Sequence, residues 1–322
     1  MMSDKKPLII LTGPTAVGKT ELSVMLAKEM NAEIISADSI QVYKYMDIGS
    51  AKITKEEMQG IKHYLVDELN PSEEFSIFKF KEMTLKYMDE IYSKGKIPII
   101  AGGTGFYIQS VLYDINFSET DDEHIYRKEL EAIAKEKGPE YLHNKLKEID
   151  AVTAQKVHSN NVKRVIRALE YYNDTGKLLS EHNEEQQKHD SPYNFKYFVL
   201  NDDRQLLYDR INKRVDKMFE LGLVKEVKNL LDMGYGRNLV SMQGIGYKET
   251  VAYILGEMNL EDTIELIKKN TRHFAKRQLT WFRREKEVTW IDYREYGNDK
   301  KVMSTKMAEM CHNAGICTDR KG

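Results

Sequence analysis

The segment from Gly13 to Thr20 carries the residue types and the spacing best suited to chemistry. Its members match the P-loop pattern in full: Gly13, Pro14, Thr15, Ala16, Val17, Gly18, Lys19 and Thr20. The glycines let the backbone bend so that successive N–H groups point at an anion, and the lysine adds a positive charge. The threonine hydroxyl can bind Mg²⁺. The segment therefore predicts an enzyme that grips a pyrophosphate or a triphosphate.

A second glycine-rich turn follows the apolar run 97–101. A motor ATPase or GTPase usually ends such a strand in an aspartate that helps to hold Mg²⁺. This chain continues instead with Gly102, Gly103, Thr104 and Gly105. At the carboxyl end of a strand, the turn should share the ligand-binding edge of a sheet with the P-loop. Two such loops suit a pyrophosphate held from two sides; a tight turn without a ligand is the alternative.

Asp38 follows another apolar run, 33–36, and should reach the same edge of the sheet. A carboxylate that faces bound phosphates is electrostatically costly unless a metal ion or a proton intervenes. We therefore interpret Asp38 as a metal partner or a general base. A helix N-cap is the alternative, since aspartate is common there.

Basic side chains gather between Arg272 and Lys286, although the net charge of the whole chain is −2. Arg277, Gln278 and Trp281 in this segment combine a charge, an amide and an aromatic ring at helical spacing. Such a combination suits unstacked RNA bases and phosphates. The alternative is that the tryptophan anchors its helix to the core.

Short apolar runs predict the strands that position these residues. The runs at 8–11, 33–36 and 97–101 lack polar alternation, which indicates buried parallel strands. Helical patterns at about 20–30 and 76–92 lie between them, and strands that alternate with helices form right-handed crossovers. The predicted fold class is therefore α/β, a P-loop-type parallel sheet flanked by helices.

The pattern changes after about residue 117. Residues 117–190 show no strand pattern and predict an all-helical insertion domain. Strand signal returns at 195–200, after which the chain is mainly helical, with a last strand pattern at 288–291. We predict a core of residues 1–116 and 191–322, interrupted by the insertion. The last ~20 residues are expected to fray.

The composition fits a folded protein, because 41% of the 322 residues are hydrophobic and 31% are charged. No apolar run reaches the ~18 residues of a membrane span, and the first strand begins too early for a signal peptide. We expect a cytoplasmic protein without membrane attachment. Cys311 and Cys317 are too few for a disulfide framework or a zinc site.

Six ordered blocks make the chain resemble the tRNA dimethylallyltransferase family, also called the tRNA isopentenyltransferase family. The blocks are the P-loop, residues 37–43 with 47–52, 101–107, 164–170, 243–249 and 271–283. Together they span nearly the whole chain. A lone P-loop is weak support for this family, whereas six blocks in order are specific. Eukaryotic members often add a C-terminal zinc finger, which this sequence lacks, so we expect a bacterial type.

The resemblance implies transfer of a dimethylallyl group from dimethylallyl diphosphate to N6 of adenine 37 beside the tRNA anticodon, with release of diphosphate. Asp38 matches the base that takes the N6 proton. The leaving group is implied to meet the P-loop, Thr104 and an Mg²⁺ ion on Thr20. Arg210 and Arg214, at i and i+4 of a predicted helix, match arginines that bind the diphosphate. Surface salt bridges with Asp209 or Asp216 are the alternative for both.

The resemblance also implies which residues contact the tRNA anticodon stem-loop. They form three groups: Asp38, Ser39, Ile40 and Gln41; Lys163, Arg164, Val165, Ile166 and Arg167; and Gln243, Gly244, Ile245, Gly246, Tyr247 and Lys248. The basic side chains of the second group share a helix face, which could also be merely solvated. We expect the RNA to lie between the insertion and the core, and we expect a monomer.

Three other functions stay open at this point. A small-molecule P-loop kinase would use Asp38 to activate a hydroxyl group. An adenylate isopentenyltransferase would prenylate free nucleotides, and a non-catalytic RNA-binding protein would keep the P-loop for stability. The basic segment and the insertion argue against the first two, and Asp38 at the ligand edge argues against the third.

Overall fold

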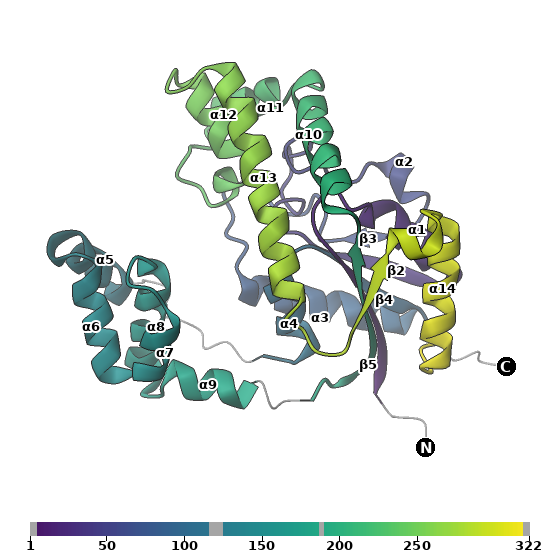
Figure 1. Ribbon diagram of the computed structural model, residues 1–322, viewed down its shortest axis with the longest axis horizontal. Coiled ribbons are helices and arrows are strands. Elements are labelled where there is room, and N and C mark those ends of the chain that lie inside the picture. Colours follow the sequence, from purple (N-terminus) through teal and green to yellow (C-terminus); the bar gives the residue numbers. More distant parts are fainter. Residues whose placement is uncertain (1–4, 116–124, 187–189, 318–322) are drawn as a thin grey trace. The chain divides into compact units, whose positions relative to one another are not determined.

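The strands of the chain form one parallel sheet. The computed structural model describes residues 5–115, 125–186 and 190–317. The sheet order is β3-β2-β4-β1-β5-β6 (Figure 1), with bounds β1 Lys6–Thr12, β2 Ala32–Ala37, β3 His63–Tyr64, β4 Ile97–Gly102, β5 Tyr193–Asn201 and β6 Val288–Asp292. All five pairings are parallel. The predicted α/β class is confirmed, and all five predicted strand segments are strands; β3 was missed because two residues carry no periodicity.

Helices flank this sheet and extend from its ends. They are α1 Lys19–Glu29, α2 Lys55–Met58, α3 Ile77–Ser93, α4 Gly105–Leu112, α10 Arg204–Glu220, α11 Leu223–Asp232, α12 Tyr247–Ile254, α13 Leu260–Phe282 and α14 Lys300–Asn313, with short 3₁₀ turns at Ser241–Gln243 and Tyr293–Tyr296. Side-chain caps begin several of them. Asp203 accepts the N–H groups of Gln205 and Leu206 at the start of α10. This cap fixes where α10 begins, and hence where its arginines lie.

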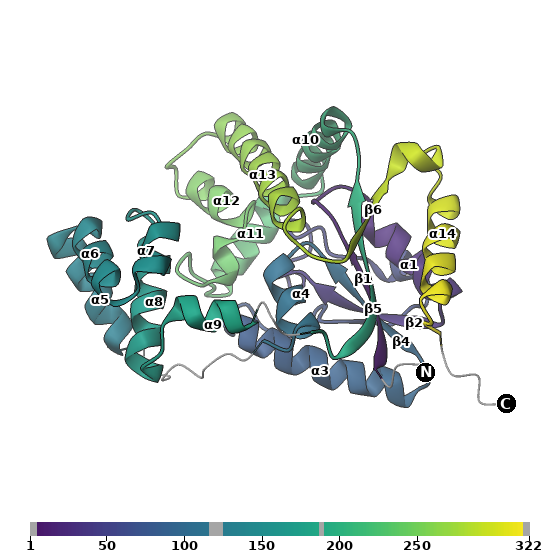
Figure 2. The same cartoon turned by 60° about the horizontal axis from the view of Figure 1, so that its bottom comes forward.

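The last helix, α14, packs beside α1 on the sheet (Figure 2). Its side chains Met303, Met307 and Cys311 are fully buried, and Ile316 beyond the helix is buried too. The expectation of a frayed end is therefore wrong as far as the structure is described. Buried residues at i, i+4 and i+8 among many polar neighbours give a narrow apolar stripe, which is easy to overlook in sequence.

The chain divides into two compact units, residues 1–112 with 192–322 and residues 113–191. The described part of the second unit contains α5 Ile125–Lys137, α6 Pro139–Ile149, α7 Ala151–Lys156, α8 Val162–Thr175 and α9 Leu179–Gln186, and no strand. Its core includes Leu130, Leu146, Val165 and Leu169. Among the described residues of the whole chain, no helix is long and apolar enough to cross a membrane.

Candidate active site

Three segments that the sequence marked for chemistry follow three neighbouring strands. The P-loop follows β1, Asp38 follows β2, and the second glycine turn follows β4, which lies between those two strands. Because the strands are parallel, their carboxyl ends meet at one edge of the sheet. The sheet order therefore brings together segments that lie far apart in sequence.

The P-loop turns from β1 into α1 through a strained backbone. Gly18 has a φ of +97°, a conformation that side chains rarely adopt. A Cβ at this position would also lie 2.5 Å from the hydroxyl oxygen of Tyr293. That hydroxyl group is buried and makes no hydrogen bond to any described residue. Tyr293 thus packs against the outside of the loop and leaves no space for a side chain at Gly18.

Lys19 folds back onto its own loop. Its Nζ donates to the carbonyl oxygens of Gly13 at 2.9 Å and Pro14 at 2.8 Å. Burial, followed by the charge of Arg214, lowers the pKa of Lys19 to about 7, and the charge of Asp38 acts in the opposite direction. The P-loop amine is therefore a cation that gains from an added anion.

A small cavity of about 60 Å³ adjoins Lys19 and Asp38. It is lined by Lys19, Thr20, Ser23, Ile34, Ser36, Asp38, Gln41, Ile53, His63, Val66, Ala101 and Gly102. Oδ1 of Asp38 accepts the backbone N–H groups of Ile40 at 2.9 Å and Gln41 at 3.3 Å. One carboxylate oxygen thus holds a turn, as in the capping alternative, while Oδ2 makes no hydrogen bond to the described part of the chain. The structure therefore places the carboxylate beside the P-loop lysine.

The two arginines of α10 differ in their surroundings. Arg210 donates through Nε to the carbonyl of Ala16 at 3.1 Å and through Nη2 to Asp202 at 2.6 Å. Its partner Asp202 is buried and directly follows β5; the sequence suggested Asp209 or Asp216 instead. Arg214 forms no hydrogen bond or ion pair among residues 5–115, 125–186 and 190–317. Burial lowers the pKa of Arg214, and the nearby charge of Asp38 opposes that shift.

The second glycine turn is tied to the P-loop by Gln278 of α13. Oε1 of Gln278 accepts the N–H of Thr15 at 2.9 Å, and its Nε2 donates to the carbonyl of Gly103 at 3.0 Å. The side chain is buried between the two loops. Thr104 donates its N–H to the carbonyl of Ala37, which precedes Asp38. Gln278 was predicted to contact tRNA; the structure places it under the loops.

Trp281 lies one turn further along α13, against the same glycine turn. Its indole ring packs onto Gly105 so closely that a Cβ there would clash. The ring of Phe106, which is 46% exposed, meets the indole ring edge-on with centroids 6.1 Å apart. Burial raises the pKa of Glu285 to about 7 against the opposing hydrogen bond from Gln109. Trp281 therefore does anchor α13, and one exposed aromatic ring stands beside it.

Two segments predicted to contact tRNA pack against each other in the first unit. Gly244 packs onto the side chain of Ile40, and Tyr247 packs onto Gly49. Gln243 and Lys248 are exposed, Ser39, Ile40, Gln41, Gly244 and Ile245 are partly buried, and Gly246 and Tyr247 are buried. The exposed side chains of this composite surface are thus few and polar.

The third predicted segment lies on α8 of the second unit. Lys163 and Arg164 are exposed and Arg167 is half-buried. Val165 and Ile166 point into the core of that unit, which takes their side chains away from any ligand on its surface. Of the residues on α13, Arg277 is exposed and stacks its guanidinium over Phe274 at 5.8 Å.

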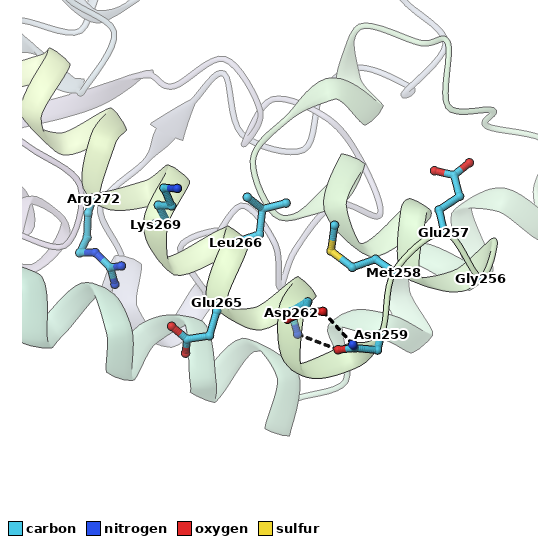
Figure 3. A pocket seen from close by; sticks show the side chains of 9 residues that line it. All are labelled: Gly256, Glu257, Met258, Asn259, Asp262, Glu265, Leu266, Lys269 and Arg272. Carbon is cyan, nitrogen blue, oxygen red and sulfur yellow. Dashed lines mark hydrogen bonds between the residues drawn. The ribbon is translucent and has the colours of Figure 1, made fainter.

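A wider hollow of about 890 Å³ lies between the end of α12 and the start of α13 (Figure 3). It is lined by Gly256, Glu257, Met258, Asn259, Asp262, Glu265, Leu266, Lys269 and Arg272. No P-loop residue borders it, and most of its polar side chains are engaged with their neighbours, as where Asn259 caps α13. The chemistry of the chain therefore points to the smaller cavity.

Sequence reasoning missed several residues that shape the site, above all Asp202, Glu226 and Tyr293. Asp202 carried a weak signal, because it follows a predicted strand at the ligand edge. Glu226 lies in a charged helical run and has no local signal. Its carboxylate accepts backbone N–H groups 177 to 179 positions earlier in the chain.

Known proteins are similar to this chain in sequence and in architecture. Residues 41–285 match the family described as IPP transferase. A tRNA dimethylallyltransferase from Lachnoclostridium phytofermentans is 59% identical over 299 residues, which cover 93% of this chain and 96% of the relative. A tRNA isopentenylpyrophosphate transferase from Bacillus halodurans matches with a TM-score of 0.73 at 45% identity, over 97% of this chain and 98% of that one. A eukaryotic dimethylallyltransferase acting on tRNA matches with a TM-score of 0.77 at 30% identity, over 98% and 86%.

Proposed function

The chain belongs to the IPP transferase family, and from this premise we propose how it works as a tRNA dimethylallyltransferase. It transfers a dimethylallyl group from dimethylallyl diphosphate to N6 of adenine 37 beside the tRNA anticodon and releases diphosphate. The observation that carries the proposed mechanism is the cavity shared by Lys19 and Asp38. A cation for the leaving group and a carboxylate for the acceptor border the same space.

Asp38 acts as the general base. The lone pair of adenine N6 is delocalised into the ring, so removal of a proton during attack makes the nitrogen a better nucleophile. A bond forms between N6 and C1 of the dimethylallyl group. The C1–O bond breaks and leaves its electrons on the diphosphate, and the N6 proton passes to Oδ2 of Asp38. Support comes from the hydrogen bonds of Oδ1, which hold the carboxylate in place and leave Oδ2 for the substrate.

Lys19, Arg214 and the P-loop amides stabilise the leaving diphosphate. Charge accumulates on its oxygens as the C1–O bond breaks, and preorganised donors act most strongly at that stage. Arg214 is suited to this role because its buried charge has no hydrogen-bonded partner in the described chain. Arg210 acts indirectly, because it holds the carbonyl of Ala16 in the P-loop.

Mg²⁺ fits the same place. The Thr20 side chain is exposed at the start of α1, and the Asp38 carboxylate borders the same cavity. A P-loop threonine hydroxyl commonly binds Mg²⁺ together with substrate phosphates, so Thr20 would hold the ion and Asp38 stays available as the base. When bound, the ion would neutralise charge on the diphosphate. Thr104 would add a further donor.

The anticodon stem-loop contacts polar side chains of each unit. Adenine 37 leaves its stack to reach the cavity, as is common for enzymes that act on bases. Ser39, Gln41, Gln243 and Lys248 of the first unit would contact the RNA, and Lys163 and Arg164 of the second unit would meet its phosphates. The acceptor is a cellular tRNA, so we expect the enzyme to work in the cytoplasm, and we expect it to act as a monomer.

One assay separates this function from its alternatives. The protein is incubated with labelled dimethylallyl diphosphate and Mg²⁺, together with unmodified tRNA, AMP or tRNA whose adenine 37 is replaced by guanine. Label should enter only the unmodified tRNA. Label in AMP would indicate an adenylate isopentenyltransferase, and phosphate transfer from ATP a kinase. RNA binding without transfer of label or phosphate would indicate a non-catalytic RNA-binding protein.

A further inference from the structure

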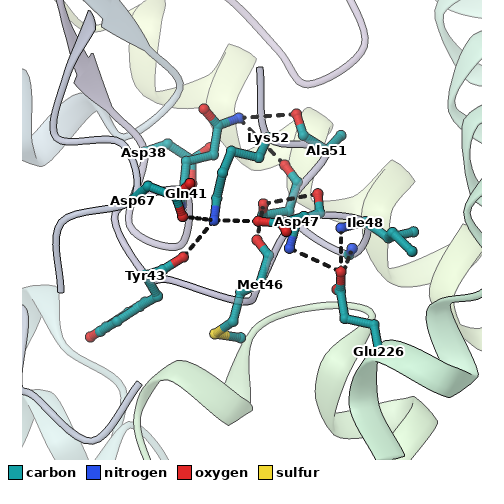
Figure 4. Close-up of polar contacts among 12 residues, drawn as sticks. Asp38, Gln41, Tyr43, Met46, Asp47, Ile48, Ala51, Lys52, Asp67 and Glu226 are labelled. Carbon is teal, nitrogen blue, oxygen red and sulfur yellow. Dashed lines mark hydrogen bonds and ion pairs between the residues drawn. The ribbon is translucent and has the colours of Figure 1, made fainter. Parts of the chain in front are cut away.

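Two charged side chains hold the loop that follows β2, one from inside and one from outside. Each of them uses its hydrogen-bonding capacity within the protein. We call residues 38–52 the acceptor loop. From inside, the ammonium group of Lys52 donates to the carbonyl of Tyr43 at 2.6 Å, to Asp47 at 2.5 Å and to Asp67 at 2.6 Å (Figure 4). The Lys52 side chain is only 5% exposed, and all three of its N–H bonds are used. Lys52 thus fixes the shape of the loop.

From outside, Glu226 of α11 receives the backbone of the same loop. Its Oε2 accepts the N–H groups of Asp47 at 3.0 Å and Ile48 at 2.7 Å, and its Oε1 accepts the N–H of Gly49 at 3.1 Å (Figure 4). The hydroxyl group of Tyr247 donates to the same Oε1 at 2.9 Å. Three consecutive N–H groups form the kind of concave site that binds anions, and here the anion is a side chain of the protein itself.

Tyr247 also packs onto the loop. Its ring is fully buried, and a Cβ at Gly49 would lie 2.6 Å from its Cζ. Only a glycine at position 49 leaves room for this ring. The hydroxyl and the ring of Tyr247 therefore act on the same peptide, one through Glu226 and one directly.

The hydrogen bonds continue from this contact to the cavity. Nε2 of Gln41 donates to the carbonyls of Ser50 at 3.4 Å and Ala51 at 3.3 Å, next to Gly49. The backbone N–H of Gln41 donates in turn to Oδ1 of Asp38. A shift of residues 47–51 would therefore be passed to Asp38 through Gln41.

We propose that Glu226 and Tyr247 are positioning residues for the transfer reaction, which hold the acceptor loop so that Asp38 meets N6 of the acceptor adenine. This inference rests on the proposed role of Asp38. Glutamine at 226 would turn an NH₂ group toward backbone N–H donors and could not accept all four hydrogen bonds. Neither residue borders the cavity, so their effect on the reaction passes through the loop.

The test compares Glu226→Gln and Tyr247→Phe with a matched control, Glu220→Gln. Glu220 is exposed at the end of α10 and forms no hydrogen bond or ion pair within the described residues. Three quantities are measured on the full chain: single-turnover rate at saturating tRNA and dimethylallyl diphosphate, KM for dimethylallyl diphosphate, and hydrogen exchange of the peptide that contains residues 47–49.

We expect Glu226→Gln to lower the single-turnover rate by about 10- to 100-fold, since small displacements of a catalytic group have effects of this size. Its KM for dimethylallyl diphosphate should change less than about twofold, because the P-loop is untouched, and exchange should accelerate at residues 47–49 but not in α1. Tyr247→Phe removes one hydrogen bond and should lower the rate about two- to tenfold. The effects of the two substitutions on the rate should not be additive when both are combined in one chain.

Faster exchange at residues 47–49 with an unchanged turnover rate in both variants would overturn the proposal, because Glu226 and Tyr247 would then stabilise the acceptor loop without affecting catalysis. A KM that rises as much as the rate falls would also overturn it. These outcomes differ from failure of the proposed function, in which the unsubstituted protein itself transfers no label to tRNA. Tyr247→Phe retains the buried ring, so the test stands even where Glu226→Gln fails to fold.

Discussion

The side-chain oxygen of Gln278 accepts a hydrogen bond of 2.9 Å from the backbone N–H of Thr15 in the P-loop. The amide nitrogen of the same side chain donates to the turn after β4. A single buried glutamine thus links two loops that follow neighbouring strands. Their separation at the diphosphate site therefore depends on a helix that begins only at Leu260, far beyond both loops in the chain.

We expect Gln278→Leu to raise the KM for dimethylallyl diphosphate about tenfold, which corresponds to ~1.4 kcal/mol of binding free energy. It should also lower the free energy of unfolding by ~1–3 kcal/mol, because a partly buried N–H and a partly buried carbonyl lose their partner. Steady-state kinetics and urea denaturation measure the two effects. Gln205→Leu is the control, since the Gln205 side chain is exposed and, among the described residues, donates only to exposed Asp209. Equal KM values in both variants would show that the link does not shape the diphosphate site.

Asp38→Asn separates the two functions of that side chain. Asparagine keeps an oxygen that can accept the N–H groups of Ile40 and Gln41, but it cannot take a proton from N6. We therefore expect turnover to fall by about 10²- to 10⁴-fold with little change in tRNA affinity. Asp38→Ala should lose the turn as well and should weaken tRNA binding further. Rapid-quench kinetics and filter binding provide the data, and an active Asp38→Asn enzyme would exclude this carboxylate as the base.

Lys19 should make stability depend on pH in a defined direction. Its pKa is about 7 in the folded protein, against an ordinary value of 10.5. Between these values the unfolded chain binds more protons than the folded one, so the free energy of unfolding rises with pH over this interval. Lys19→Met should flatten that rise. Urea denaturation at pH 7, 8 and 9 without ligand measures it, with Lys28→Met as an exposed control. The same slope in all three proteins would contradict the buried, weakly basic amine.

The two arginines of α10 should respond in opposite ways to substitution. Arg214→Gln removes a partly buried cation that has no hydrogen-bonded partner within residues 5–115, 125–186 and 190–317, and it should raise the KM for dimethylallyl diphosphate with little loss of stability. Arg210→Gln leaves the buried Asp202 carboxylate without its partner, and it should lower the free energy of unfolding by ~1–3 kcal/mol. Kinetics and denaturation of both variants test this pair. Equal changes in KM would assign both side chains to the diphosphate instead.

Local sequence patterns were enough to predict most of the sheet and the P-loop. Buried parallel strands are continuous apolar runs, and the P-loop needs a fixed set of residues in fixed order. The rule that ligands bind at the carboxyl edge then placed Asp38 beside Lys19, in agreement with the cavity that both line. These inferences succeed because their physical causes act within a few residues.

What could not be predicted depends on partners distant in the chain. Nothing near Glu226 indicates that its carboxylate meets three backbone N–H groups of another segment. The partner of Arg210 was sought on its own helix, whereas the cap at Asp203 turns the chain so that Asp202 faces it. The narrow apolar stripe of α14 was overlooked among polar neighbours for the same reason. It can be explained only by α1, the distant helix that it covers.

The packing of α14 against α1 has a consequence for how the chain is made. α1 leaves the ribosome before the α14 residues that cover it, and β1 needs β5, whose residues are synthesised after the whole second unit. The phosphate-gripping loop between β1 and α1 therefore cannot reach its final form before β5 and α14 have been made. Until then the nascent chain exposes the apolar face of α1 and an unpaired strand edge, which favours aggregation or chaperone capture.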